Sequence, residues 1–254
     1  MTQQEMLFLV PQKLKEIEKE YGIRILYAVE SGSRAWGTNA PTSDFDIRFL
    51  YIRPREDYLR LDPIRDVLEF PIDEGWDMCG WDLTKVLQLL HNSNSQIYEW
   101  LASPLVYVGD GFSSRFRPVL DAYFSTKTVA NHYLHQADMK MKTAAKAERP
   151  KVKHYLYSLQ HLAAAQWVLT HQAPPPVSFQ QLMEQMQGDV CREAQGLLMQ
   201  KTTQQPLTDH IPFLDAWLAE ERSRIHQQIG QLPREPEKSW ELLNRFFLSE
   251  LDRQ

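Results

Sequence analysis

The sequence is poor in cysteine and contains no long apolar run, and each absence excludes a class of protein. Only two cysteines are present, Cys79 and Cys191, and they lie far apart without the spacing of metal ligands. We interpret both as buried or tolerated thiols. No apolar run approaches the roughly 18 residues that a membrane-spanning helix requires, and no signal peptide is recognisable. We therefore expect a cytoplasmic protein that does not enter a membrane.

The sequence also lacks an excess of positive charge. Its formal net charge is −5, so no global basic field draws the chain to nucleic acid, although a local basic patch remains open. Hydrophobic residues make up 43% and charged residues 24% of the chain, which is ordinary for a soluble globular protein. At 254 residues the chain can bury a substantial core and suggests one large domain or two small ones.

The most informative stretch is 31–46, SGSRAWGTNAPTSDFD, which lies between two apolar runs. These runs, at 23–29 and 47–52, predict two strands. Asp44 and Asp46 are two positions apart at the start of the second strand, so their side chains share one face. Paired carboxylates hold a proton or bind a cation, and hard oxygen ligands suit Mg²⁺. A D-x-D pair that stands alone is common, and a turn residue followed by a solvated strand residue is the simpler explanation of it.

Two small residues upstream strengthen the functional interpretation. Gly32 directly follows the first predicted strand, where a glycine lets the backbone come close to a ligand. Ser33 is a candidate N-cap for a short helix through Ala35 and Trp36. The free N–H groups of a helix start suit phosphate, although a capped tight turn without a ligand has the same residues. A phosphate cradle followed closely by paired carboxylates is far less common than either feature alone.

This arrangement resembles a known superfamily. Gly32-Ser33, a loop and then Asp44-Phe45-Asp46 match the pattern of the DNA polymerase beta-like nucleotidyltransferases. The longer string SGSRAWGTNAPTSDFDIRFLYI resembles one branch, the predicted nucleotidyltransferases associated with RNA ligases in RNA repair. That branch reads S-G-S-R-A-[YW]-G…S-D-x-D-x-R-F-x-Y. The resemblance implies an α/β (α+β) fold, with a small mixed sheet and flanking helices followed by an all-helical C-terminal domain. It also implies Mg²⁺ or Mn²⁺ as cofactor and an NTP as substrate.

The resemblance further implies a third acidic residue on a strand beside the first pair, which completes a two-metal site. Asp77 and Asp82 are the candidates. Asp82 precedes an apolar periodic run and reads as a helix N-cap, whereas Asp77 lies within a predicted strand, 76–81. We therefore choose Asp77, and predict that Asp44, Asp46 and Asp77 are the catalytic and metal-binding residues.

Several further residues are predicted to bind substrate. Gly32 and Ser33 would contact the β- and γ-phosphates, and Arg34 or Arg48 could offset charge that develops on the leaving group. Arg48 shares a face with Asp46 by period two, so an ion pair with that carboxylate explains it slightly better.

A basic stretch at 139–162 supplies further candidates. Its cations could neutralise a triphosphate and its aromatic residues could stack on a base, but a solvated helix face explains such a run as well. Lys153 and Tyr157 match the K-x-x-x-Y-x-L pattern of the resembled branch, so we include both as substrate-binding candidates. Asn94 and Glu99 match its N-x-x-x-x-E pattern, with a helix cap and an exposed glutamate as the alternative.

Apolar spacing predicts the remaining elements. The first helix is expected at 5–20, with a start near Pro11 as the alternative. Further strands are expected at 65–71 and 76–81, and an extended connection at 104–109. No strand is convincing from residue 113 onward, so we predict a catalytic domain at 1–110 and a helical domain at 111–254. Its helices are expected at 113–124, 126–147, 151–171, 178–186, 190–201, 211–229 and 235–251.

The acceptor is the least determined part of the function. The resemblance suggests an RNA end, but an acidic chain argues mildly against extensive RNA contact, since phosphate contacts need Lys and Arg. Nucleotidylation of a protein or of a small hydroxyl compound by the same site is an alternative. A non-catalytic nucleotide- or RNA-binding module is another, and it would bind an NTP without releasing pyrophosphate.

Overall fold

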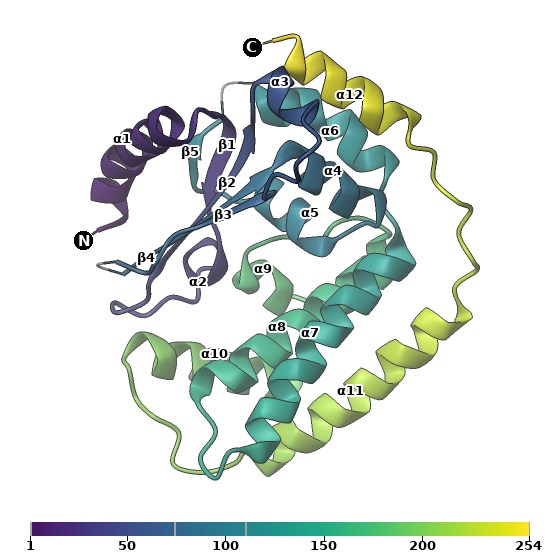
Figure 1. Cartoon of the computed structure of the whole chain (residues 1–254). Helices are drawn as coiled ribbons and strands as arrows, with labels where there is room; N and C mark the ends of the chain where they lie inside the picture. The colour runs from purple at the N-terminus through teal and green to yellow at the C-terminus, as the bar shows by residue number, and fades with distance from the viewer. Residues whose placement is uncertain (1, 74, 110, 254) are drawn as a thin grey trace.

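The computed structural model describes residues 2–73, 75–109 and 111–253, and its centre is a five-stranded mixed sheet (Figure 1). The strand order is β3-β4-β2-β1-β5. Only β2 and β4 are parallel among these pairs, and the other neighbours are antiparallel. The predicted small mixed sheet is therefore confirmed. The strands are β1 (Arg24–Glu30), β2 (Phe45–Ile52), β3 (Val67–Glu69), β4 (Trp76–Asp82) and β5 (Val106–Val108).

Helices cover both faces of the sheet (Figure 1). The first helix packs on one face, and helices that follow β4 in the chain pack on the other. From the N-terminus they are α1 (Gln3–Tyr21), α2 (Gly32–Ala35), α3 (Arg55–Tyr58), α4 (Leu83–His91), α5 (Ser95–Leu101) and α6 (Phe112–Ala122). The rest are α7 (Thr126–Lys146), α8 (Val152–His171), α9 (Phe179–Met183), α10 (Gly188–Thr202), α11 (Pro212–Gln231) and α12 (Glu241–Leu251).

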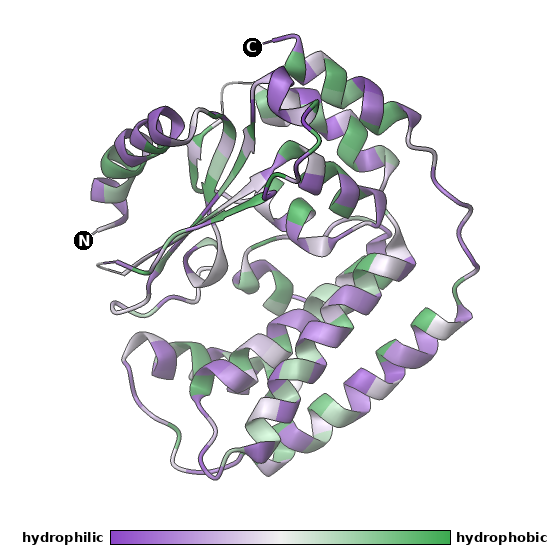
Figure 2. Cartoon of the chain, viewed as in Figure 1, coloured by the Kyte–Doolittle hydropathy of each residue, from purple (hydrophilic) through white to green (hydrophobic). Residues whose placement is uncertain are grey.

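Two hydrophobic clusters hold these layers together. The smaller cluster joins α1 to one face of the sheet and includes Leu14, Ile17, Ile47 and Phe49. The larger cluster begins on the opposite face, at Leu26, and continues through the helical part of the chain. Figure 2 shows both hydrophobic and hydrophilic residues along α1 and α11, as expected for helices with one buried side. In the described part of the chain, no helix is long and apolar enough to cross a membrane.

The structure corrects several local predictions. The first helix runs through Pro11 and starts at Gln3, where Thr2 forms a capping box with Glu5, so the alternative start at Pro11 is wrong. Ser33 is not an N-cap, because α2 already begins at Gly32 and Ser31 precedes it. The expected extended connection at 104–109 contains the edge strand β5. The last helix begins later than residue 235, at Glu241.

The helical part is built on an antiparallel pair, α7 and α8, with α11 packed along it (Figure 1). The final helix, α12, returns to the first half of the chain and packs against α4 and α6. There Arg24 donates a hydrogen bond to the carbonyl of Glu250, at 3.0 Å. Every described secondary-structure element after residue 111 is a helix. The division of the chain into two domains at residue 110 stays a prediction.

Candidate active site

Gly32 brings the turn after β1 against a carboxylate of β2. Its φ is +58°, and a Cβ atom at this position would lie 2.2 Å from Oδ2 of Asp46. The neighbouring Ser31 donates its backbone N–H to the carbonyl of Asp46, at 2.8 Å. Glycine is required here for its left-handed backbone and for the absence of a side chain. The approach to a ligand stays a prediction, and the group that the Gly32 backbone approaches within the protein is the Asp46 carboxylate.

Asp46 and Asp77 are direct partners in the parallel pair of β2 and β4. The sequence-based choice of Asp77 over Asp82 agrees with this register. Asp82 has the other predicted role, because it caps α4 by accepting the N–H of Thr84 at 2.9 Å. Neighbouring strands lie about 4.8 Å apart, so the two carboxylates project from adjacent positions. Asp44 precedes β2 and is exposed.

Arg48 lies between the two strand carboxylates. Its Nη2 is 2.8 Å from Oδ2 of Asp77 and 3.3 Å from Oδ1 of Asp46. Its Nη1 donates to the backbone carbonyl of Asp77, at 2.7 Å. The ion-pair interpretation of Arg48 therefore describes its position. A fixed cation that contacts both carboxylates also holds them in place.

The charge balance at this edge of the sheet suits a divalent cation. Burial, together with the nearby Asp77 and Asp44, raises the pKa of Asp46 to about 6 against the opposing effect of Arg48. In the described residues, no three acidic, histidine or cysteine side chains are already gathered around one metal position. Asp46 and Asp77 nevertheless supply hard oxygen donors from rigid strands, which is the ligand chemistry that Mg²⁺ prefers. The residues present therefore fit the cation.

A buried acid beneath Asp46 was not predicted from the sequence. Glu30 is fully buried, and its Oε1 accepts the backbone N–H of Asp46 at 2.7 Å. Its Oε2 accepts the hydroxyl of Tyr107, which in turn accepts Nε2 of Gln3 at 3.0 Å. Burial raises the pKa of Glu30 to about 7. The one sequence signal for this role is an isolated acid at the end of an apolar strand.

Arg34 forms hydrogen bonds with the backbone of the loop that carries Asp44. Its Nε donates to the carbonyl of Asp44 at 3.1 Å, and its Nη2 to the carbonyl of Ser43 at 2.7 Å. Its guanidinium carbon also lies 3.7 Å from the centre of the Phe45 ring. These contacts occupy the guanidinium with the protein itself, so its position favours a role in holding the loop.

A cavity of about 400 Å³ joins this edge of the sheet to the helical part of the chain. The sheet side contributes Gly32, Asp46 and Arg48, and helices α5, α7 and α8 form the opposite wall. The lining residues are Ser31, Gly32, Trp36, Asp46, Arg48, Gln96, Glu99, Trp100, His135, Gln136, Met139, Lys140, Tyr157 and His161.

Tyr157 is the contact point between the helical wall and the loop after β1. Its hydroxyl accepts Nζ of Lys201 at 2.7 Å and interacts with the side chain of Ser33. Nζ of Lys201 lies 4.5 Å, and Nζ of Lys140 5.8 Å, from the centre of the Tyr157 ring. Burial, together with nearby Lys153, lowers the pKa of Lys201 to about 8. Cations of three helices thus gather around one tyrosine.

Sequence reasoning singled out Tyr157, Lys153 and the basic stretch that contains Lys140, but it missed Lys201. Tyr157 lines the cavity, whereas Lys153 is exposed and does not. Lys201 was missed because it follows the basic stretch by some forty positions and α10 carries no motif.

The helical wall of the cavity contains two polar side chains, half-buried Glu99 and buried His161. Glu99 accepts Nε1–H of Trp36 at 2.5 Å, and burial raises its pKa to about 7. The interpretation of Glu99 as an exposed residue is therefore wrong, while Asn94 is the predicted cap of α5. His161 is only 4% exposed, and its Nδ1 has no hydrogen-bond partner among the described residues.

His161 predicts a specific pH dependence of folding. Burial lowers its pKa to about 3 from the ordinary 6.5. Below pH 6.5 the unfolded chain binds a proton that the folded chain does not, so stability is lost as the pH falls from 6.5 toward 3. Between pH 7 and pH 5 this residue should reduce the unfolding free energy by about 2 kcal/mol. The His161→Phe variant should lose that component in denaturant titrations at the two pH values, and an unchanged pH dependence would contradict the assignment.

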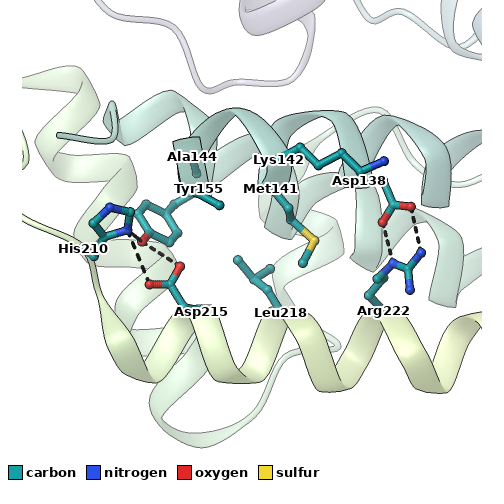
Figure 3. Close-up of a pocket in the computed structure, with 10 residues that line it drawn as sticks. Asp138, Met141, Lys142, Ala144, Tyr155, His210, Asp215, Leu218 and Arg222 are labelled. Atoms are coloured by element: carbon teal, nitrogen blue, oxygen red, sulfur yellow. Dashed lines mark hydrogen bonds and ion pairs between the residues drawn. The ribbon is translucent and has the colours of Figure 1, made fainter. Parts of the chain in front are cut away.

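A second cavity, of about 440 Å³, lies between α7, α8 and α11 (Figure 3). Both of its acids, Asp138 and Asp215, pair with other lining residues. Arg222 contacts Asp138 through two hydrogen bonds, of 2.6 and 3.0 Å, and Tyr155 donates to Asp215 at 2.8 Å. Since these groups satisfy each other, we place the candidate active site at the first cavity, where carboxylates gather around one arginine.

Comparisons with known proteins place the chain in a family. The family model "RlaP: RNA repair pathway DNA polymerase beta family" matches residues 8–249. A Bacillus subtilis (strain 168) protein described as "Uncharacterized protein YcgL" is 34% identical over 246 residues, which cover 94% of each chain. The crystal structure of a nucleotidyltransferase-like protein from Exiguobacterium sibiricum 255-15 aligns with 96% of this chain and 80% of that one. The identity to that protein is 15%, and the TM-score is 0.33.

Proposed function

Because the chain belongs to the RNA repair pathway DNA polymerase beta family, we propose that it is a metal-dependent nucleotidyltransferase. It moves a nucleoside monophosphate from an NTP to a hydroxyl acceptor and releases pyrophosphate. The observation that carries this proposal is the register of Asp46 and Asp77, side by side on β2 and β4. Their edge of the sheet borders a cavity at which the backbone of Gly32 meets the Asp46 carboxylate.

The carboxylates have the central role in this reaction. Asp44, Asp46 and Asp77 would hold Mg²⁺ or Mn²⁺, which when bound offsets the charge of the triphosphate and lowers the pKa of the acceptor hydroxyl. Arg48 holds Asp46 and Asp77 in position. The acceptor oxygen forms a bond to the α-phosphorus, the bond from that phosphorus to the oxygen that bridges it to the β-phosphorus breaks, pyrophosphate leaves with that oxygen, and the hydroxyl proton passes to solvent.

The cations around Tyr157 lie where the polyphosphate would be placed. Lys201 and Lys140 flank the tyrosine ring, and its hydroxyl contacts Ser33 of the loop after β1. Positive groups at this position would offset the charge of the β- and γ-phosphates. Lys153, although exposed, adds to the same positive region through its proximity to Lys201.

Lys201 provides a test of this placement. The Lys201→Met variant removes the cation and keeps much of the side-chain volume. We expect KM for the NTP to rise about tenfold, the cost of one charge-assisted hydrogen bond. The matched control is Lys142→Met, because Lys142 is an exposed lysine at the second cavity. Equal KM values for the Lys201 variant and the wild type would contradict a phosphate contact.

The acceptor we propose is an RNA end, with the family description as its support. The direct experiment incubates the purified protein with each of the four labelled NTPs, with Mg²⁺ or Mn²⁺, and with short RNAs, tRNA or no added acceptor. Label on RNA ends together with released pyrophosphate is the expected result. Label on the protein itself would move the assignment to protein nucleotidylation. NTP binding without any transfer would favour a non-catalytic binding module.

A further inference from the structure

One part of the cavity that Asp46 lines combines polar and aromatic side chains, and we call it the inner end. Glu99 of α5 and His161 of α8 line it together with Trp36, which follows α2. The Trp36 ring meets the rings of Tyr157 and His161 edge-on, with centres 5.1 and 5.9 Å apart. Rings held in this way form rigid apolar surfaces, on which a flat ligand can pack.

Each polar residue of this pocket has hydrogen-bonding capacity that the protein leaves unused. Glu99 accepts the indole N–H of Trp36 at Oε1, and no described residue donates to its Oε2. His161 is buried, and its Nδ1 has no partner among the described residues. Buried polar side chains in native proteins nearly always have a partner. The buried, unpaired Nδ1 of His161, on a cavity that the free Oε2 of half-buried Glu99 also lines, therefore points to a ligand that supplies the missing hydrogen bonds.

The position of the pocket indicates which part of a ligand reaches it. The same cavity contains Asp46 and Gly32 on its sheet side, while Glu99 and His161 lie on its helical wall. The lysines that suit a polyphosphate gather around Tyr157. A group bound against Glu99 and His161 would thus be attached to the phosphates but distinct from them. It is flat, and it carries N–H donors as well as acceptors along its edge.

We propose that Glu99 and His161 are specificity-determining residues that bind the edge of the nucleobase of the NTP. This inference rests on the proposed function. Glu99 accepts a base N–H at Oε2, and the neutral imidazole of His161 bonds the neighbouring position of the base. The four bases place their donors and acceptors differently, so a fixed acceptor beside a fixed imidazole favours one base over the others.

Two variants separate this role from a structural one. Glu99→Gln keeps an oxygen for Trp36 and replaces the other oxygen with an N–H₂ donor, so it reverses the hydrogen bond offered to the base. His161→Phe keeps a ring and removes its polarity. Glu20→Gln, at an exposed position of α1, is the matched control. Thermal unfolding of each variant verifies the fold, and His161→Phe should melt at or above the wild-type temperature because it removes a buried unpaired group.

The measurement is calorimetric binding of the four NTPs, and of tripolyphosphate as a ligand without a base, in the presence of Mg²⁺. The wild type should prefer one NTP by about 10- to 100-fold, the value of one hydrogen bond to a charged group. Both variants should reduce that preference about tenfold or more and leave tripolyphosphate affinity unchanged. Equal wild-type affinities, a preference that survives in both variants, or no NTP binding at all would overturn the inference. Selective binding without nucleotide transfer would support the inference and contradict the proposed function.

Discussion

The Asp46→Asn variant is expected to lose nucleotide transfer by at least about 10³-fold, which corresponds to the several kcal/mol that a metal ion contributes to stabilising the transition state. Asn keeps the shape of the side chain but removes the charge. Asp77, which pairs with position 46 across the strands, would then face Arg48 alone. In that arrangement one guanidinium neutralises one carboxylate. Little attraction for a divalent cation would remain.

The fold of this variant should stay intact. Burial and two neighbouring acids already raise the pKa of Asp46, so the folded state gains little from its charge, and the melting temperature should be unchanged or slightly higher. Pyrophosphate release, measured with the NTP and acceptor that label best, gives the readout. Asp121→Asn, at an exposed position of α6, is the control and should retain activity. Full transfer by Asp46→Asn would refute the assignment of the site.

The sequence was most informative where local rules act. The strand that carries Asp46 was recognisable from its apolar run, and Asp82 from the helix that it caps. That assignment left Asp77 as the acid beside Asp46, and the strand register places it there. The proline within α1 was misleading, because tertiary packing of Leu14 and its neighbours outweighed the local cost of Pro11.

Sequence reasoning failed where the site depends on long-range contacts. Glu30 meets Tyr107 and Gln3, residues that only the folded sheet and α1 bring together. Lys201 reaches Tyr157 from a helix without any motif. No local periodicity records such contacts, since each depends on the packing of elements that are distant along the chain. For Glu99 the alternative of an exposed residue was wrong, because helix spacing alone did not reveal that Glu99 is half-buried and bonded to Trp36.

The Gly32→Ala variant tests whether the close approach of the loop to Asp46 matters for chemistry. The new methyl group would lie 2.2 Å from Oδ2 of Asp46, so either the loop or the carboxylate must move. A displacement of about 1 Å at a catalytic group can cost about 10²-fold in rate. We therefore expect a loss of about that size in kcat, measured as pyrophosphate release at saturating NTP.

Gly37 provides an unusually close control for this variant. It lies in the same turn and also has a positive φ, +71°, but a Cβ atom there would meet nothing within 4 Å. Both Gly32→Ala and Gly37→Ala should lose about 1–2 kcal/mol of stability because each forces alanine into the left-handed region, and Gly32→Ala should lose more because of its contact with Asp46. Only Gly32→Ala should also lose activity. If the two variants lose activity equally, strain in the loop explains the effect; if only Gly32→Ala does, the contact with the Asp46 carboxylate is what the glycine preserves.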